Sequence, residues 1–255
     1  MRPSVHILLM SPMPQSSQFP WSETEFSRRL RLAVKEYWLG RGGQYSQQAS
    51  RGTKDAGKRG EVTGGQHLNR FLGLLTEVAE AAGFARDEIK LRQGIELPGY
   101  FRPQKRWDMV VVRGSRLCAA VELKSQVGSF GNNFNNRSEE AIGNSTDFWT
   151  AFREGGMGKE TPWLGYFFLL EQAAKSSQPV GLKPGFFPPF PVFEGTSYAR
   201  RYEILCERLV LERKYTRTAL LLSPRGASGR YVEPNPALDF YGFAKSLHAH
   251  LGGCR

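Results

Sequence analysis

The sequence has few cysteines and no long apolar run. Its three cysteines, Cys118, Cys206 and Cys254, lack the paired spacing of a zinc site or a disulfide framework. No apolar stretch approaches the roughly 20 residues that a membrane-spanning helix needs. The run from Val5 to Met10 is too short for the core of a signal peptide. These absences predict a reduced, cytoplasmic protein without a membrane anchor.

Acidic residues are also scarce relative to basic ones. The chain has 24 Asp and Glu against 35 Lys and Arg, which gives a formal net charge of +11. A positive field of this size favours a polyanionic partner, either nucleic acid or an anionic membrane surface. Because many basic proteins bind neither, charge alone does not establish that this protein has a polyanionic partner. An aromatic content of 12% makes global disorder improbable.

The N-terminal third is expected to contain a helix and a long polar segment. We expect a flexible leader over residues 1–20 and a single domain over 21–255. Ser22 and Glu25 have capping-box spacing, and apolar residues then recur at helical spacing, which predicts a helix over 22–39. Residues 40–65 are almost free of apolar side chains and predict a basic, mobile loop. That loop is either a solvated linker or an arm that orders on phosphates.

The rest of the chain alternates between helical and strand patterns. Interleaving of this kind predicts an α/β fold with a mixed sheet flanked by helices. In order, the patterns predict a helix from a cap at Thr63 and Gln66 to Gly83, a strand at 89–92, a loop at 94–103, a hairpin of strands at 109–112 and 117–123, a Gly/Asn-rich loop at 128–136, a helix at 138–153, a strand at 164–170, a proline-rich loop at 179–191, a helix at 198–213, a strand at 218–222 and a helix at 236–251.

An acidic residue two positions before a lysine occurs at Glu88–Lys90, Glu122–Lys124 and Glu212–Lys214. About one such match is expected by chance, so the tripeptide alone carries little weight. The middle match alone lies at the end of an apolar strand. Strand alternation there sends Glu122 and Lys124 to one face of the sheet.

The hairpin supplies a second acid. If Gly114–Arg116 forms a three-residue loop, counting outwards places Asp108 opposite Glu122, with β-carbons about 5 Å apart. Two carboxylates at that distance suggest a hard cation, Mg²⁺ or Mn²⁺. A two-residue loop or a bulge would change the count. The alternative is structural: Asp108 pairs with Arg106 or Lys105, and Glu122 with Lys124. However, this glutamate and lysine interrupt an otherwise apolar strand, where an unpaired charge is costly.

Two longer segments resemble a known family. Gly-Tyr-Phe-Arg-Pro-Gln-Lys-Arg-Trp-Asp at 99–108 and Val-Glu-Leu-Lys-Ser-Gln-Val-Gly-Ser-Phe-Gly-Asn-Asn-Phe-Asn-Asn-Arg at 121–137 resemble the XhoI family of type II restriction endonucleases. That family is part of the PD-(D/E)-x-K nuclease superfamily. The resemblance extends from about Thr63 through the C-terminal helix. In one departure, Trp107 stands where the superfamily often has a proline before its first acid.

The resemblance implies a restriction-endonuclease-like fold and Mg²⁺-dependent hydrolysis of double-stranded DNA at a palindrome, CTCGAG, leaving 5′-phosphate and 3′-hydroxyl ends. It implies that Asp108 and Glu122 bind Mg²⁺ with the Leu123 carbonyl, and that Lys124 holds the attacking water and a phosphate oxygen. It also implies a cognate DNA methyltransferase that competes for the same site in the cell. A palindromic site implies a homodimer, because protein symmetry must match DNA symmetry.

Polar side chains after the catalytic strand are candidates for reading the DNA. Asn, Gln and Arg make paired hydrogen bonds to base edges, which favours Gln126, Asn135, Asn136 and Arg137 as DNA-binding residues. The alternative is that the Gly/Asn pairs simply form turns. The apolar stretch 186–193 could serve the dimer interface or the core.

Two other functions stay open on the sequence alone. The same acid and lysine pattern occurs in structure-selective and repair nucleases, which share the chemistry without sequence preference. A non-catalytic DNA-binding protein would also explain the positive charge. Histidine-based nuclease chemistry finds little support, since the four histidines form neither an HNH nor an H-x-K arrangement.

Overall fold

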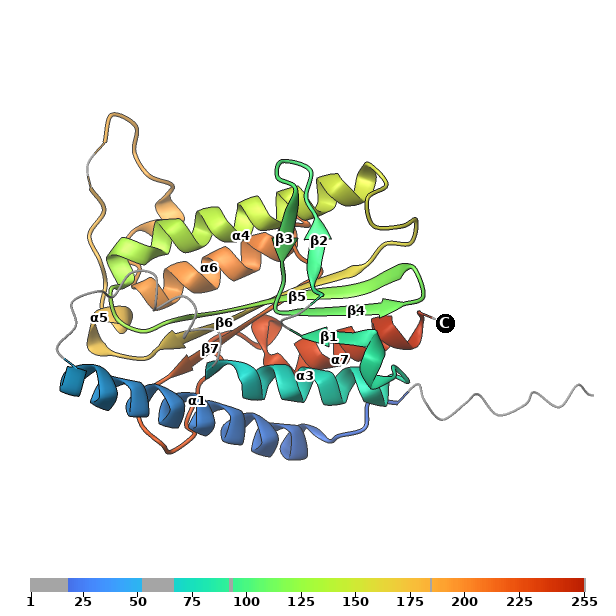
Figure 1. Cartoon of the computed structure of the whole chain (residues 1–255). Helices are drawn as coiled ribbons and strands as arrows, with labels where there is room; N and C mark the ends of the chain where they lie inside the picture. The colour runs from blue at the N-terminus through green and yellow to red at the C-terminus, as the bar shows by residue number, and fades with distance from the viewer. Residues whose placement is uncertain (1–17, 52–66, 92–93, 184, 255) are drawn as a thin grey trace, which may run out of the picture.

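The protein is built around one central sheet with helices on both faces (Figure 1). The computed structural model describes residues 18–51, 67–91, 94–183 and 185–254, without the side chains of 43–51. The sheet has five strands in the order β1-β4-β5-β6-β7. Helices α4 and α6 cover one face, while α3 and α7 cover the other and α1 packs outside them. The predicted mixed α/β, restriction-endonuclease-like architecture is confirmed.

The sheet is antiparallel at one end and parallel at the other. β1 pairs with β4 and β4 with β5 in antiparallel fashion, whereas β5, β6 and β7 are parallel. All five strands of this sheet were predicted: the short strand β1 and the four strands β4 to β7, which have apolar runs. Their bounds are β1 Ile89–Leu91, β4 Met109–Arg113, β5 Arg116–Gln126, β6 Trp163–Glu171 and β7 Arg217–Ser223.

Apart from the short helix α5, which was not predicted, the α-helices occupy the predicted regions, with three differences in extent that are given below. In the part of the chain that the structure describes, no helix has the length and apolar character to cross a membrane. The α-helices are α1 Glu23–Arg51, α3 Asn69–Ala81, α4 Phe130–Arg153, α5 Ala174–Ser177, α6 Tyr198–Leu211 and α7 Phe240–Gly252, and single 3₁₀ turns lie at η2 Arg86–Glu88, η3 Pro191–Phe193 and η4 Pro236–Leu238.

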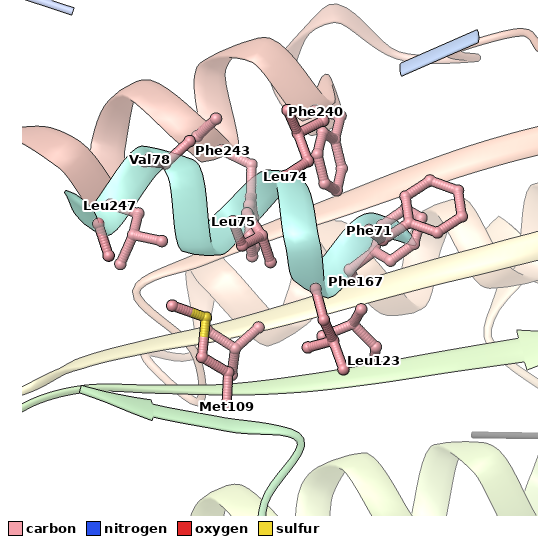
Figure 2. Close-up of a cluster of buried hydrophobic side chains, with 14 of the residues drawn as sticks. Phe71, Leu74, Leu75, Val78, Met109, Leu123, Phe167, Phe240, Phe243 and Leu247 are labelled. Carbon is pink, nitrogen blue, oxygen red and sulfur yellow. The ribbon is translucent and has the colours of Figure 1, made fainter. Parts of the chain in front are cut away.

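The sheet separates two apolar cores. Figure 2 shows the first core, where Phe71 of α3 and Phe240 of α7 meet Phe167 and Leu123 of the sheet. The second core lies between the sheet and the helices α4 and α6. Because Leu123 points into the first core, alternation along β5 turns Glu122 towards the face that α4 covers. The packing of this strand therefore decides which face carries the charged residues.

Helix α1 is longer than the sequence predicts. It continues past Leu39 to Arg51, so the loop expected over 40–65 is wrong for its first part. Gln, Arg and Ala are adequate helix formers, and each added residue extends an existing helix by one hydrogen bond. Residues 52–66, with the capping signal at Thr63 and Gln66, lie outside the described residues, as do residues 1–17 of the leader. At the end of that leader, Phe19 packs edge-on against Trp21 and Tyr241.

The segment expected to be a loop at 94–103 starts a small hairpin. Strand β2, Glu96–Pro98, pairs with β3, Gln104–Arg106, in a separate two-stranded sheet. Its residues are mostly exposed and polar, so they lack the apolar alternation by which strands are recognised. In Figure 1 this hairpin stands out from the main sheet and crosses α4.

Helix α4 begins earlier than predicted. The loop expected at 128–136 is wrong from Phe130 onwards, where the helix starts after a left-handed Ser129. Gly and Asn are weak helix formers, but Phe130 and Phe134, one turn apart, pack against Tyr198 of α6. Tertiary packing overrides local propensity here. The helix at 236–251 shows the opposite difference, because α7 begins only at Phe240, after Asp239 caps it.

Candidate active site

The β4–β5 hairpin has the predicted register through two compensating differences. Arg113 pairs with Arg116, so the turn has two residues and the predicted three-residue loop is wrong. A bulge then adds Cys118 to β5, between the two halves of the ladder. The turn has one residue fewer than predicted and β5 has one more, so the two differences cancel in the pairing of the strands. Met109 therefore lies opposite Val121, as the count from a three-residue loop required.

Asp108 lies directly before the first residue of β4 and extends the contact between this segment and β5. Its backbone N–H donates to the Val121 carbonyl at 3.1 Å, and its Oδ2 accepts from the Leu123 backbone N–H at 2.7 Å. The N–H and C=O of one strand residue point to the same side of the strand. The Leu123 carbonyl therefore faces the edge on which Asp108 lies.

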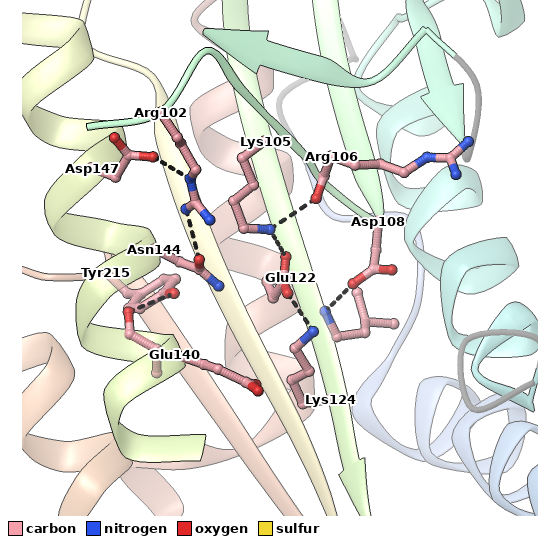
Figure 3. A network of polar contacts seen from close by, with 12 residues as sticks. Arg102, Lys105, Arg106, Asp108, Glu122, Lys124, Glu140, Asn144, Asp147 and Tyr215 are labelled. Atoms are coloured by element: carbon pink, nitrogen blue, oxygen red, sulfur yellow. Dashed lines mark hydrogen bonds and ion pairs between the residues drawn. The ribbon is translucent and has the colours of Figure 1, made fainter. Parts of the chain in front are cut away.

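Glu122 lies between two lysines (Figure 3). Its Oε2 accepts from Lys105 Nζ at 2.6 Å, and its Oε1 is 2.7 Å from Lys124 Nζ. The Glu122 side chain is 4% exposed, against 10% for Lys105 and 29% for Lys124. A buried carboxylate needs such partners, because losing water costs several kcal/mol per ion. Lys124 is the more exposed of the two lysines and can reach a ligand.

The pKa values of the two acids are shifted in opposite directions. Burial raises the pKa of Asp108 to about 6, and the nearby charge of Glu122 adds to the rise. Burial also acts to raise the pKa of Glu122, but the charges of Lys124 and Lys105 outweigh it, so that pKa lies below its usual value. Burial lowers the pKa of Lys105. For Lys124 the attraction of Glu122 outweighs burial and raises the pKa.

Lys105 is a member of this site that the sequence did not identify. The sequence offered it as a partner for Asp108, whereas the structure pairs it with Glu122. It comes from β3 of the small hairpin, and its ammonium lies 4.0 Å from the centre of the Trp107 ring. Trp107 is buried and packs edge-on against Phe148 of α4. The residue that replaces the usual proline thus anchors the strand and supports this lysine.

Helix α4 brings a third acid to the neighbourhood. Glu140 adds to the attraction that raises the pKa of Lys124, and Figure 3 shows it below that lysine. Arg137, one turn earlier, donates to Glu140 at 2.5 Å. No sequence signal singled out Glu140, because its link to Lys124 depends on how α4 lies across the sheet.

The four predicted DNA-binding residues have different surroundings. Asn135 and Asn136 are exposed on the first turns of α4. Arg137 is partly exposed and tied to Glu140. Gln126 is buried, and its side-chain amide donates to the Gly128 carbonyl, so it is not presented for contact in this structure.

The donor atoms at the site suit a hard divalent cation. Two carboxylates and a backbone carbonyl are the oxygen ligands that Mg²⁺ prefers. Asp108 carries a charge that its surroundings disfavour and that a cation would stabilise, whereas Glu122 is ionised and already paired with two ammonium groups. Within the described ranges no group of three or more His, Cys, Asp or Glu side chains is arranged to hold a metal. Any ion at this site therefore depends on the two acids and the backbone.

Comparison with known proteins places the chain in a family. The family model described as "Restriction endonuclease XhoI" matches residues 47–233. The type II restriction enzyme BstVI of Geobacillus stearothermophilus is 47% identical over 207 residues, which cover 78% of this chain and 92% of that enzyme. The type II restriction enzyme XhoI of Xanthomonas vasicola is 44% identical over 204 residues, 78% of this chain and 82% of that enzyme.

A third relative, the type II restriction enzyme AbrI of Azospirillum brasilense, is 43% identical over 157 residues, 60% of this chain and 70% of that enzyme. No solved structure gives a significant match. The matched region contains the whole of the site described above, from Lys105 to Glu140. On the family match and these identities, the chain belongs to the XhoI family of restriction endonucleases.

Proposed function

We propose that this protein is a type II restriction endonuclease that hydrolyses phosphodiester bonds of double-stranded DNA at a palindromic site. The observation that carries the proposal is that Asp108, directly before β4, lies against the part of β5 that carries Glu122 and Lys124, in a chain that belongs to a restriction endonuclease family. Two acids with a lysine beside them are the groups that such hydrolysis requires. The resemblance of the sequence to this family suggests CTCGAG as the site.

Asp108 and Glu122 would hold a Mg²⁺ ion, with the Leu123 carbonyl as a further ligand. When bound, the ion would neutralise charge on the scissile phosphate and lower the pKa of the attacking water. The protein's own part is to keep Glu122 ionised and to orient Asp108. Lys105 and Lys124 stabilise the charged Glu122, and the Leu123 N–H orients Asp108.

Lys124 would bind the substrate. Its raised pKa keeps it protonated at neutral pH, so it donates hydrogen bonds and does not act as a general base. With 29% of its side chain exposed, it can reach a non-bridging phosphate oxygen and the attacking water. The positive charge of this ammonium would stabilise negative charge on the phosphate. In-line attack would leave 5′-phosphate and 3′-hydroxyl ends.

A palindromic site calls for a two-fold symmetric protein, so we propose a homodimer. Phe186, Phe187 and Phe190 are exposed by 95%, 80% and 73%, which fits an interface better than the core. We take the protein to be cytoplasmic. In the cell the enzyme would compete with a cognate DNA methyltransferase for the same site. Asn135, Asn136 and Arg137 are the proposed contacts to the bases, since α4 carries them in the turns before Glu140, the acid that acts on Lys124.

Digestion of a plasmid of known sequence in Mg²⁺, followed by sequencing of the ends, tests this proposal. Discrete fragments with ends inside one palindrome support it. A smear, or cutting only at junctions and damaged sites, would favour a nuclease without sequence preference. Binding without any cleavage would favour a non-catalytic DNA-binding protein.

A further inference from the structure

The tip of the β2–β3 hairpin is an ordered structure that the proposed chemistry does not use. It comprises residues 99–103, and the strand that leaves it carries Lys105 into the active site. Gly99 packs so closely that an added β-carbon would lie 2.5 Å from the Arg102 carbonyl oxygen and 2.8 Å from Asp147 Oδ2. The tip therefore has one tightly folded conformation.

A buried acid of α4 holds the tip in place. Asp147 Oδ1 accepts from the backbone N–H groups of Tyr100 and Phe101, at 2.7 and 2.9 Å. Its Oδ2 accepts from Arg102 Nε at 2.7 Å, and Arg102 also donates to Asn144 at 2.8 Å (Figure 3). The Asp147 side chain is 6% exposed, so these donors compensate for its burial. The bonds fix the backbone of the tip, and they leave the two aromatic side chains out of the network.

Those aromatic side chains face solvent. Tyr100 is 54% exposed and Phe101 is 70% exposed, and their rings touch edge to face with centroids 5.0 Å apart. Large apolar side chains displayed on a rigid support are typical of contact surfaces. Basic side chains lie close by in the sequence: Arg102 within the tip and Arg106, with 60% of its side chain exposed, at the end of β3.

We propose that this tip is a DNA-contacting arm, in which Tyr100 and Phe101 pack against deoxyribose and base edges next to the scissile phosphate. The inference rests on the proposed function. Only three residues lie between Phe101 and Lys105, so DNA held at the active site must pass near the tip. The formal charge of +11 and the neighbouring arginines favour a polyanion over a second protein. Asp147 acts as a positioning residue, because it fixes the arm before DNA arrives.

The test measures the affinity of a Tyr100→Ser/Phe101→Ser variant for a duplex containing CTCGAG, in Ca²⁺ to prevent cleavage. We expect affinity to fall by at least about 10-fold, since the variant no longer buries two aromatic rings against deoxyribose and base edges. The slope of affinity against salt should not change, because no phosphate contact is removed. Arg106→Gln, by comparison, should reduce that slope by about one if this side chain meets a phosphate.

A matched control is Leu32→Ser/Leu39→Ser on α1, which removes two apolar side chains of 47% and 52% exposure on the opposite side of the sheet. It should bind DNA like the wild type. Asp147→Asn should weaken binding although both aromatic rings are still present, because the arm is no longer fixed. Thermal melting checks that each variant folds.

Three results would overturn the proposal that the tip is a DNA-contacting arm. They are wild-type affinity in the Tyr100/Phe101 variant, equal weakening in the α1 control, or weakening that light scattering traces to loss of a dimer. The last result would assign the tip to a protein interface. If the wild type neither binds nor cuts the duplex, the proposed function itself fails, and that outcome is distinct from the others.

Discussion

The carboxylate of Asp108, the residue directly before β4, accepts the backbone N–H of Leu123 in β5 at 2.7 Å. The acid is thus held against β5 beyond the β4–β5 ladder, and it experiences the charge of Glu122. Such an arrangement is unfavourable for folding and useful for binding a cation. Functional sites often keep groups that destabilise the fold in this way.

Asp108→Asn should stabilise the metal-free protein at pH 7.5 while abolishing cleavage. Asn can accept the same hydrogen bond from Leu123 without a charge beside Glu122. The pKa of Asp108 is raised from 3.8 to about 6, so its ionisation disfavours the folded state above pH 6 and has no effect below about pH 4. For this group, stability of the wild type falls as pH rises between those values.

The measurement is the melting temperature of both proteins without metal from pH 4.5 to 7.5. The variant should melt higher at pH 7.5, and the difference should shrink towards pH 4.5. A variant that melts lower than the wild type at pH 7.5 would show that the charge of Asp108 is already compensated.

Lys105→Met should destabilise the metal-free protein by about 2 kcal/mol. Removing one partner of a buried ion pair leaves an uncompensated charge, and the loss is smaller than the roughly 3–5 kcal/mol of a fully broken pair because Lys124 still pairs with Glu122. Excess Mg²⁺ should recover part of that stability, because a cation at Glu122 replaces the missing charge.

Urea unfolding with and without Mg²⁺ measures this effect. Lys175→Met, at an exposed position of α5, is the control and should change neither value. If Mg²⁺ stabilises the Lys105 variant no more than the control, the ion does not bind at Glu122.

Asn136→Ala should weaken discrimination of the cognate site without affecting stability. The side chain is exposed on α4, so its removal costs no packing, whereas one lost pair of hydrogen bonds to a base costs about 1–3 kcal/mol. We expect kcat/KM on the cognate duplex to fall by roughly 10-fold or more. Equal loss on cognate and single-mismatch duplexes would show that Asn136 does not read sequence.

Gln126→Ala is the contrasting variant. Its buried amide donates to the Gly128 carbonyl, so truncation leaves a buried acceptor unpaired and should lower the melting temperature. Discrimination among sites should stay close to that of the wild type.

The sequence predicted the elements that carry a strong apolar pattern and the acids attached to them. Strand β5 is apolar on both faces, so Glu122 and Lys124 stood out within it. The register of Met109 against Val121 came out right although the loop length did not, because the bulge at Cys118 compensates for the shorter turn. A bulge leaves no mark in the pattern of apolar residues, so it could not be predicted.

Residues that depend on tertiary contacts were out of reach of the sequence. Lys105 pairs with an acid 17 positions away, and Arg102 with one 45 positions away. Neither β2 nor β3 has a periodic apolar pattern from which it could be predicted. The start of α4 was missed for a related reason, since Phe130 and Phe134 hold a Gly/Asn-rich segment helical only by packing against α6.

The most direct test of the central claim compares Glu122→Gln with the wild type on one CTCGAG duplex, by cleavage in Mg²⁺ and by binding in Ca²⁺. Gln keeps the size of the side chain but loses the charge that a cation requires. We predict that cleavage falls by at least about 1,000-fold while the variant still folds and retains its preference for CTCGAG over other duplexes. A variant that cuts at a rate near that of the wild type would contradict the assignment of Glu122 and, with it, of the whole site.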